Sequence, residues 1–126
     1  MFSHILVGTN EVAAAKKFYD AVLGTLGITE GDHNEEKQRI YYRSPNGTLI
    51  VTKPIDGNPA SVGNGSTIGF KCASEEQARA FHDAAVEAGG TSIEDPPGWR
   101  VNGDNKMFLA YVRDLDGNKL NSIFRG

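Results

Sequence analysis

Three histidines and one cysteine are the side chains of this sequence most able to do chemistry. His4 stands in the short apolar run HILVG, where it can either hydrogen-bond a bound molecule or be satisfied inside the core. A strand pocket would allow its imidazole to act as an acid or base near neutral pH. We expect His82 to be a partly exposed helix residue, His33 to lie in a solvated charged loop and Cys72 to be a small buried side chain.

A polar amide, Asn121, occupies the middle of the last predicted strand. The turn residues 116–118 precede a strand predicted over residues 119–124. Because side chains alternate along a strand, Asn121 shares its face with Lys119 and Ile123. The pattern leaves two interpretations open, an amide that lines a pocket and an amide that is solvated.

Aromatic and basic side chains gather on the later predicted strands and in the loop between them. In a concave site, aromatic walls with a few donors suit a planar or amphipathic small molecule, and arginine suits a carboxylate or phosphate on it. We select Tyr111 and Trp99 as candidate ligand-binding residues, because strand alternation alone requires about half of the set to be core or rim. The set comprises Arg39, Tyr41, Tyr42, Arg43, Trp99, Arg100, Phe108 and Tyr111.

The composition predicts one soluble globular domain with neither a nucleic-acid nor a membrane partner. The chain has 126 residues, of which 39% are hydrophobic and 23% charged. Its net charge is -3 and its basic residues are scattered, so no basic patch is predicted for nucleic acid or an anionic membrane. No apolar run is long enough to span a bilayer, and the first residues do not resemble a signal peptide. A single cysteine cannot form an internal disulfide, and we expect a cytoplasmic location.

The sequence contains an internal duplication. Residues 3–27 align without a gap with residues 66–90, and residues 41–52 align with residues 111–122. The order and spacing of the identities agree in both blocks. They are Ser3/Ser66, Ile5/Ile68, Ala15/Ala78, Phe18/Phe81, Asp20/Asp83, Ala21/Ala84 and Gly27/Gly90, then Tyr41/Tyr111, Arg43/Arg113 and Gly47/Gly117.

Each half is predicted to form a strand, a helix and further strands. The first helix begins near Glu11 with Asn10 as its N-cap, and the second begins with a capping box of Ser74 and Gln77. Glycines at the end of each periodic segment suit the helix stops. The predicted strands cover residues 4–8, 38–43, 48–53, 68–72, 107–113 and 119–124, with a further one near 91–94. Residues 95–105 are rich in Pro, Gly and Asn and are expected to form a mobile loop.

These elements predict a single domain, residues 1–126, built of two repeats. The first βαβββ module covers residues 1–55, the linker residues 56–65 and the second module residues 66–126.

Two βαβββ halves, the opening SHILVGTNEVAAAKKFYDAVLG and the closing RDLDGNKLNSI resemble the vicinal oxygen chelate superfamily. Its members include glyoxalases, extradiol dioxygenases, fosfomycin-resistance thioltransferases and bleomycin-resistance proteins. The shared features are a histidine in the first strand, a helix carrying FY before LG, and a DPDGN-like turn followed by a strand. The resemblance implies an α+β fold of two tandem βαβββ modules that form a curled mixed-sheet cup with helices outside. It also implies a ligand inside the cup and, usually, a homodimer.

The resemblance also implies where a metal would be held. In metal-binding members, His and Glu side chains occupy equivalent strand positions in the two modules, and here those positions read His4, Val51, Thr67 and Asn121. One imidazole, one hydroxyl, one amide and a valine supply a single strong donor, whereas zinc sites use three or four and harder ions prefer carboxylates. We therefore predict no tightly bound divalent metal and no other cofactor.

Three functions stay open. The favoured one is a metal-free protein that binds a small molecule in the cup through Thr67, Asn121, Tyr111 and Trp99. The second is a metal-dependent enzyme resembling lactoylglutathione lyases or dioxygenases. The third is a metal-independent enzyme in which His4 acts as acid or base beside Thr67 and Asn121. The expected partners are a small-molecule ligand and a second copy of the chain.

Overall fold

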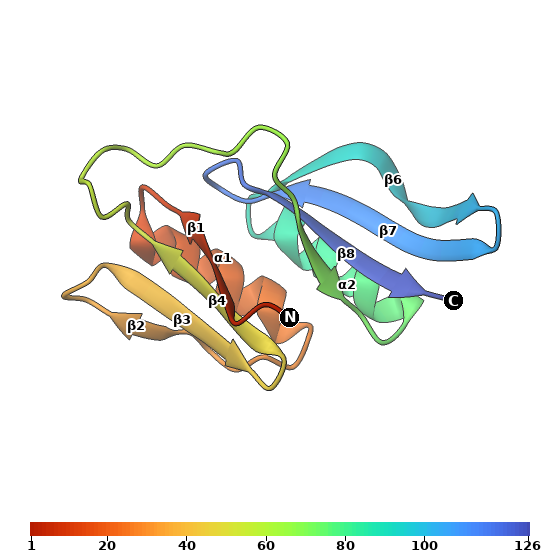
Figure 1. The fold of residues 1–126 in the computed structure, drawn as a ribbon, viewed down its shortest axis with the longest axis horizontal. Helices are drawn as coiled ribbons and strands as arrows, with labels where there is room; N and C mark the ends of the chain where they lie inside the picture. Colours follow the sequence, from red (N-terminus) through yellow and green to blue (C-terminus); the bar gives the residue numbers. More distant parts are fainter.

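Two four-stranded sheets and two helices make up the computed structural model, which describes residues 1–126 (Figure 1). The first half forms β1 (His4–Gly8), α1 (Val12–Gly24), β2 (Asp32–Asn34), β3 (Arg39–Ser44) and β4 (Gly47–Thr52). The second half forms β5 (Ile68–Lys71), α2 (Glu75–Glu87), β6 (Thr91–Asn102), β7 (Asn105–Arg113) and β8 (Lys119–Arg125).

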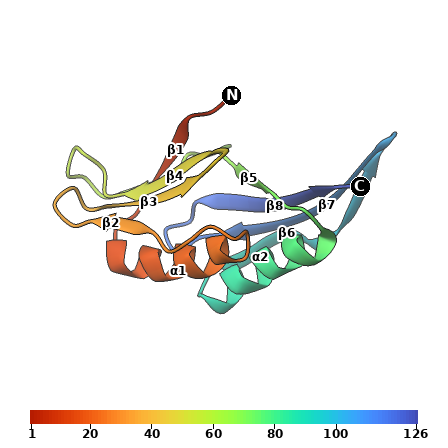
Figure 2. The ribbon, with the colours of Figure 1, turned by 90° about the horizontal axis from the view of Figure 1, so that it is seen from below.

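The two sheets have the same topology. Their strand orders are β1-β4-β3-β2 and β5-β8-β7-β6, with β1 parallel to β4 and β5 parallel to β8, and all other pairs antiparallel. The expected α+β fold of two βαβββ modules is therefore confirmed. Both helices cover the same side of the two sheets (Figure 2), so the helix-free faces look the same way and the predicted cup is open in a single chain. Neither helix has the length and hydropathy that crossing a bilayer requires.

The hydrophobic core lies between the sheets and the helices and extends across both modules. Apolar side chains recur on one face of α1 and α2 at helical spacing and meet alternate residues of the strands. Because α1 and α2 contact each other, one cluster of 14 buried residues serves both halves. Its largest members include Phe18, Tyr19, Ile40, Tyr42, Phe81, Val112 and Leu120.

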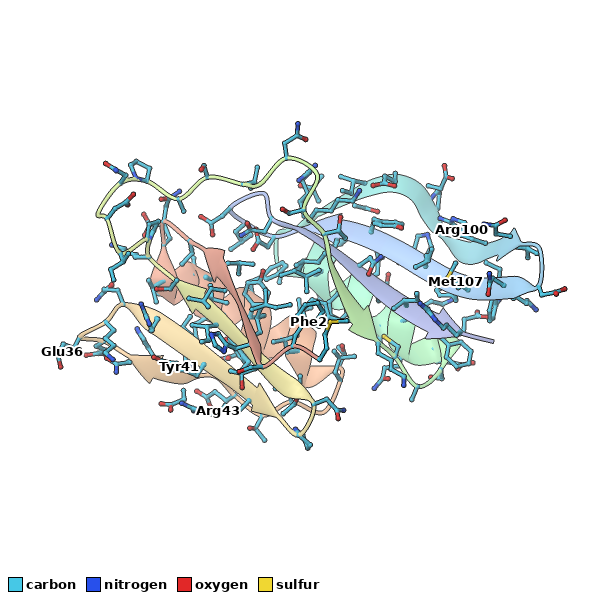
Figure 3. All side chains as sticks on the ribbon, in the orientation of Figure 1. Phe2, Glu36, Tyr41, Arg43, Arg100 and Met107 are labelled. Atoms are coloured by element: carbon cyan, nitrogen blue, oxygen red, sulfur yellow. The ribbon has the colours of Figure 1, made fainter.

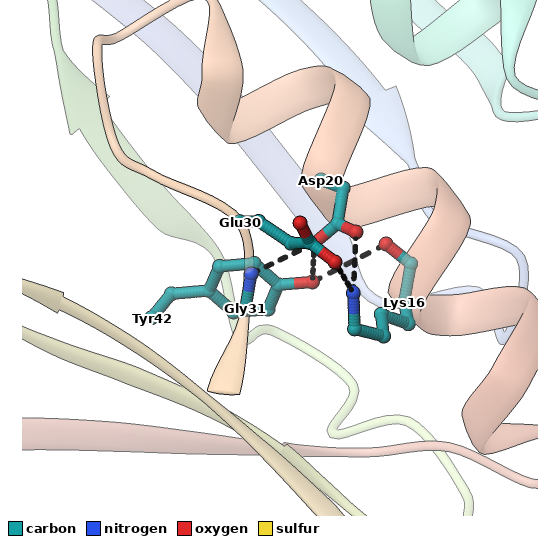
Figure 4. Close-up of polar contacts among 5 residues, drawn as sticks. All are labelled: Lys16, Asp20, Glu30, Gly31 and Tyr42. Carbon is teal, nitrogen blue, oxygen red and sulfur yellow. Dashed lines mark hydrogen bonds and ion pairs between the residues drawn. The ribbon is translucent and has the colours of Figure 1, made fainter. Parts of the chain in front are cut away.

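Hydrogen bonds fix α1 to the sheet of the first module (Figure 4). The carboxylate of Asp20 accepts from the Tyr42 hydroxyl at 2.8 Å and from the Gly31 backbone N–H at 2.9 Å. Lys16 Nζ lies 2.8 Å from the carboxylates of both Asp20 and Glu30. Burial alone would raise the pKa of Asp20, but the hydrogen bonds from Lys16, Gly31 and Tyr42 together hold that pKa below its ordinary value.

A second polar cluster joins the two modules. The Tyr19 hydroxyl donates to the buried carboxylate of Asp114 at 2.5 Å. Asp114 also accepts from the backbone N–H groups of Asp116 and Asn118, and Asn118 Nδ2 donates to the Gly8 carbonyl at 3.0 Å. Burial and the nearby Asp114 charge raise the pKa of Tyr19, so its hydroxyl remains a donor at neutral pH.

The segment predicted as a mobile loop is part of a strand, so that prediction was wrong. β6 runs from Thr91 to Asn102 and pairs with β7, with a register shift between Ile93 and Gly98. Pro96 and Pro97 fall inside that irregularity, on an edge strand, where a missing backbone N–H breaks no ladder hydrogen bond. Because an irregular edge strand accepts Pro and Gly, the abundance of these residues wrongly indicated a loop here.

Smaller corrections concern helix starts and histidines. The helix α1 begins at Val12 without a side-chain cap, because Asn10 bonds the backbone of Ala60 instead. In α2, Ser74 caps the Gln77 N–H as predicted, at 3.1 Å. His82 is buried rather than partly exposed, with Nε2 2.8 Å from Ser92 Oγ.

Candidate functional site

The helix-free face of the first sheet carries His4. Val7 lies on the opposite face of β1 from His4 and packs against the core. His4 and Leu6 therefore point away from the helices. His4 is exposed, and its Nδ1 lies 2.8 Å from Ser3 Oγ. No carboxylate holds this imidazole, so the orienting partner typical of a histidine base is absent from the structure.

Val51 does not belong to this face, contrary to the sequence alignment of the two halves. It is fully buried in the core, whereas its neighbour Ile50 pairs with both Leu6 and Tyr41 on the helix-free face. In the second sheet Asn121 pairs in the same way with Gly69 and Tyr111, so Ile50 is its structural counterpart. The reason is that the hairpin from Tyr41 to its partner Ile50 is one residue shorter than the hairpin from Tyr111 to its partner Asn121, and a shift of one residue reverses the face of a strand.

Asn121, Tyr111 and Gly69 form the centre of the helix-free face of the second sheet. Tyr111 and Gly69 are the cross-strand neighbours of Asn121 on β7 and β5. Gly69 leaves the space beside the amide free of side chain, and a Cβ at that position would lie 2.7 Å from Asn121 Oδ1. Asn121 Oδ1 is buried and has no hydrogen-bond partner in the protein. The centre therefore carries an amide and a phenol side by side, with the amide oxygen turned towards Gly69 and out of contact with solvent.

Lys119 and Glu94 also lie at this centre, and sequence analysis did not select them. The Lys119 ammonium lies 4.9 Å from the centre of the Tyr111 ring and forms an ion pair with Glu94. The alternation that groups Lys119 with Asn121 could have identified the lysine. Glu94 could not have been found, because it stands in the irregular part of β6 with a φ of 59°.

Trp99 lies on the opposite side of the second sheet. It pairs with the buried Phe108, and its indole N–H donates to Glu75 of α2 at 2.8 Å. Its ring also packs edge-on against Phe108 and Phe124. The structure thus separates Trp99 from Tyr111 and Asn121, with which the sequence had grouped it.

His4 of the first module and Thr67 of the second module line different cavities. His4 lines a cavity of about 550 Å³ with the first half of β1, the turn before β4 and β5. Thr67 precedes β5, is exposed and lines a cavity of about 510 Å³ under the linker. The structure brings together Asn121 and Tyr111, and it leaves His4 and Thr67 at the margin between the sheets.

Comparison with known proteins identifies the family. The model of the Glyoxalase/Bleomycin resistance protein/Dioxygenase superfamily matches residues 1–121. The chain belongs to this superfamily. No curated protein matches it.

Solved structures of the superfamily share this fold. A glyoxalase/bleomycin resistance protein from Albidiferax ferrireducens T118 is 54% identical over 99% of each chain, with a TM-score of 0.94. A glyoxalase-related enzyme from Fulvimarina pelagi is 18% identical, with 98% of this chain and 87% of that chain covered and a TM-score of 0.73. A lactoylglutathione lyase from Agrobacterium tumefaciens is 14% identical, with 98% and 92% covered and a TM-score of 0.68.

The metal that many superfamily enzymes hold does not fit the residues of this chain. At the positions corresponding to its ligands, the structure has His4, Ile50, Thr67 and Asn121. Only the imidazole is a strong donor, and no carboxylate is present to compensate the lost hydration of a divalent cation. No three His, Cys, Asp or Glu side chains anywhere in the chain are grouped so that they could hold a metal. The donor set therefore argues against chemistry that depends on such an ion.

Proposed function

We propose that this superfamily member binds a small molecule on the helix-free faces of its sheets without a metal ion. The observation that supports this proposal best is the donor set: an amide and an isoleucine stand where a carboxylate would be needed, while Tyr111 and Asn121 lie side by side on the same helix-free face. Because the Asn121 amide can both donate and accept, it suits a neutral polar group of the ligand. Tyr111 adds an aromatic wall.

A second copy of the chain would complete the cup. In a single chain both helix-free faces are open, and the apolar side chains of Phe2 and Leu6 are 69% and 46% exposed. A homodimer that pairs these faces would remove apolar surface from water and enclose the ligand. We also propose a cytoplasmic location, because the one cysteine is buried and can form no internal disulfide.

Metal binding is the decisive test of the proposal. Purified protein is dialysed against zinc and then against metal-free buffer, and its metal content is measured by mass spectrometry. We expect much less than one zinc per chain. One retained ion per wild-type chain that is lost in His4→Ala would overturn the proposal.

Ligand binding is tested in parallel with a small-molecule library and thermal unfolding. Compounds that raise the Tm of the wild type should lose that effect in Asn121→Leu. The matched control is Asn102→Leu, an exposed amide at the tip of the β6–β7 hairpin. Equal responses of both variants would contradict a ligand site at Asn121.

A further inference from the structure

A groove separates the two modules where their sheets fail to join. β1 and β5 are both edge strands, and no strand pairs with their facing free edges. The groove, called the inter-module groove below, has a volume of about 550 Å³. It is bounded by residues 2–5, 26–29, 43–49 and 68–71. This volume falls within the range of about 300–1,000 Å³ that is usual for small-molecule sites.

The floor of the inter-module groove is apolar. Leu26, Ile28, Ile68 and Phe70 line it, and all four are partly buried side chains that pack against the main core. These four side chains lie on the helix side of the sheets. No strand covers them, because β1 and β5 do not pair with each other. Phe2 lies at the mouth of the gap between the two sheets (Figure 3).

The rim of the groove carries cationic side chains and no anionic one. Arg43 and Lys71 line it, and none of the 20 lining residues is Asp or Glu, although the chain as a whole has a net charge of -3. Arg43 is paired with Asp32 at 2.8 Å, whereas Lys71 is exposed and forms no ion pair. Lys71 is therefore the free cation of the rim.

The C-terminal end of α1 lies beside the floor but leaves little negative potential there. Backbone N–H groups of Thr25, Leu26 and Gly27 donate to the last carbonyls of the helix. Gln77 Nε2 of α2 donates to the Thr25 carbonyl at 3.0 Å. With these carbonyls satisfied, the charge that a ligand meets is set mainly by the basic rim.

We infer that the inter-module groove is a second binding site, for an amphiphilic anion such as a medium-chain carboxylate. The hydrocarbon tail lies on the floor formed by Leu26, Ile28 and Phe70, and the carboxylate lies at Lys71. This site adjoins the proposed one through Gly69, which lines the groove, but neither Asn121 nor Tyr111 does. Apolar contact holds the tail, and charge complementarity fixes its direction.

The test is calorimetric titration of the full chain with hexanoate, octanoate and decanoate below their micelle concentrations. Affinity should rise about fourfold for each added methylene that the floor buries. Lys71→Glu should weaken decanoate binding about tenfold, by analogy with a charge pair at contact distance. Lys17→Glu, the same change at an exposed position on α1, should have no effect. A decyltrimethylammonium cation should bind more weakly than decanoate to the wild type.

Methyl NMR locates the bound chain and separates this inference from the proposed function. Decanoate should shift the methyl signals of Leu26, Ile28 and Ile68, and Asn121→Leu should leave its affinity unchanged. Equal decanoate affinity in Lys71→Glu and Lys17→Glu would overturn the inference. So would binding that Asn121→Leu abolishes, which would place the anion on the helix-free face. The inference would also be overturned if decanoate left the methyl signals of the groove unshifted because a second copy of the chain covers them.

Discussion

Asn121 owes its position to its two neighbours on adjacent strands. Tyr111 flanks it on β7, and Gly69 on β5 leaves the space that its amide occupies. The buried Oδ1 atom has no partner within the protein. Leaving a buried acceptor unpaired costs about 1–3 kcal/mol, and a ligand that donates a hydrogen bond would recover part of that cost if the amide turned to expose its oxygen.

Gly69→Ala tests this arrangement. A Cβ would lie 2.7 Å from Asn121 Oδ1, the end of a side chain that can rotate away, so the amide must move and we expect a change of less than about 1 kcal/mol in the free energy of unfolding. Chemical denaturation measures this change, and the side-chain amide signals of Asn121 report the movement. Gly24→Ala is the control, since a Cβ there meets no atom within 4 Å. In a helix that change should stabilise by about 0.5–1 kcal/mol. Unchanged Asn121 signals in Gly69→Ala would contradict the prediction.

Single residues show how far the sequence can define such a site. Composition and alternation singled out Asn121 and Tyr111 as candidates but not as neighbours, and they left the orientation of His4 open until the structure placed it on the helix-free face. Alignment of the halves placed Val51 opposite Asn121, because a one-residue difference in loop length cannot be recognised without the pairing of the strands. Trp99 was misplaced for a related reason, since the irregularity in β6 changes which of its residues face the helices.

At the scale of elements, the duplication and the hydrophobic periodicity predicted both helices and most of the strands, and the family resemblance implied their arrangement in two βαβββ modules. The order of the strands came only from the structure. The extension of β6 through Asp95–Asn102 was not predictable, because Pro and Gly are tolerated at a bulge on an edge strand that only the partner β7 defines. The β2 strand is three residues long and has no sequence period.

Asp20 connects α1 to its sheet in a way that depends on pH. Its pKa is held below the ordinary value, so the carboxylate contributes stability above the unfolded pKa, and that contribution is lost as the pH falls towards the folded value. Asp20→Asn should therefore lower the free energy of unfolding at pH 7 by about 1–2 kcal/mol, allowing for partial exposure. The difference should shrink as the pH falls below about 4, near the ordinary pKa of aspartate.

Urea unfolding between neutral and acidic pH measures this effect. The control is Asp104→Asn, because Asp104 is exposed in the β6–β7 turn and forms no hydrogen bond or ion pair through its side chain. We expect Asp104→Asn to unfold in parallel with the wild type at every pH. If the free energies of unfolding of the wild type and Asp20→Asn differ by the same amount at every acidic pH, the carboxylate charge is not what stabilises the contact.

At the scale of the whole molecule, both helix-free faces lie on one side of the chain, and the helices share the other (Figures 1 and 2). This arrangement places Asn121, Tyr111 and the exposed Leu6 of β1 on one surface. We propose that a second copy of the chain covers this surface.

Leu6→Glu tests the proposed homodimer. Leu6 lies on the helix-free face of β1 with 46% of its surface exposed, so the charge should be tolerated in a monomer but not in a dimer interface. Light scattering after size exclusion should give the mass of two chains for the wild type and the mass of one chain for Leu6→Glu. Val86→Glu is the control, because Val86 is similarly exposed, at 41%, but lies on α2. Dimers that survive Leu6→Glu but dissociate in Val86→Glu would mean that the helices, rather than the helix-free faces, form the interface.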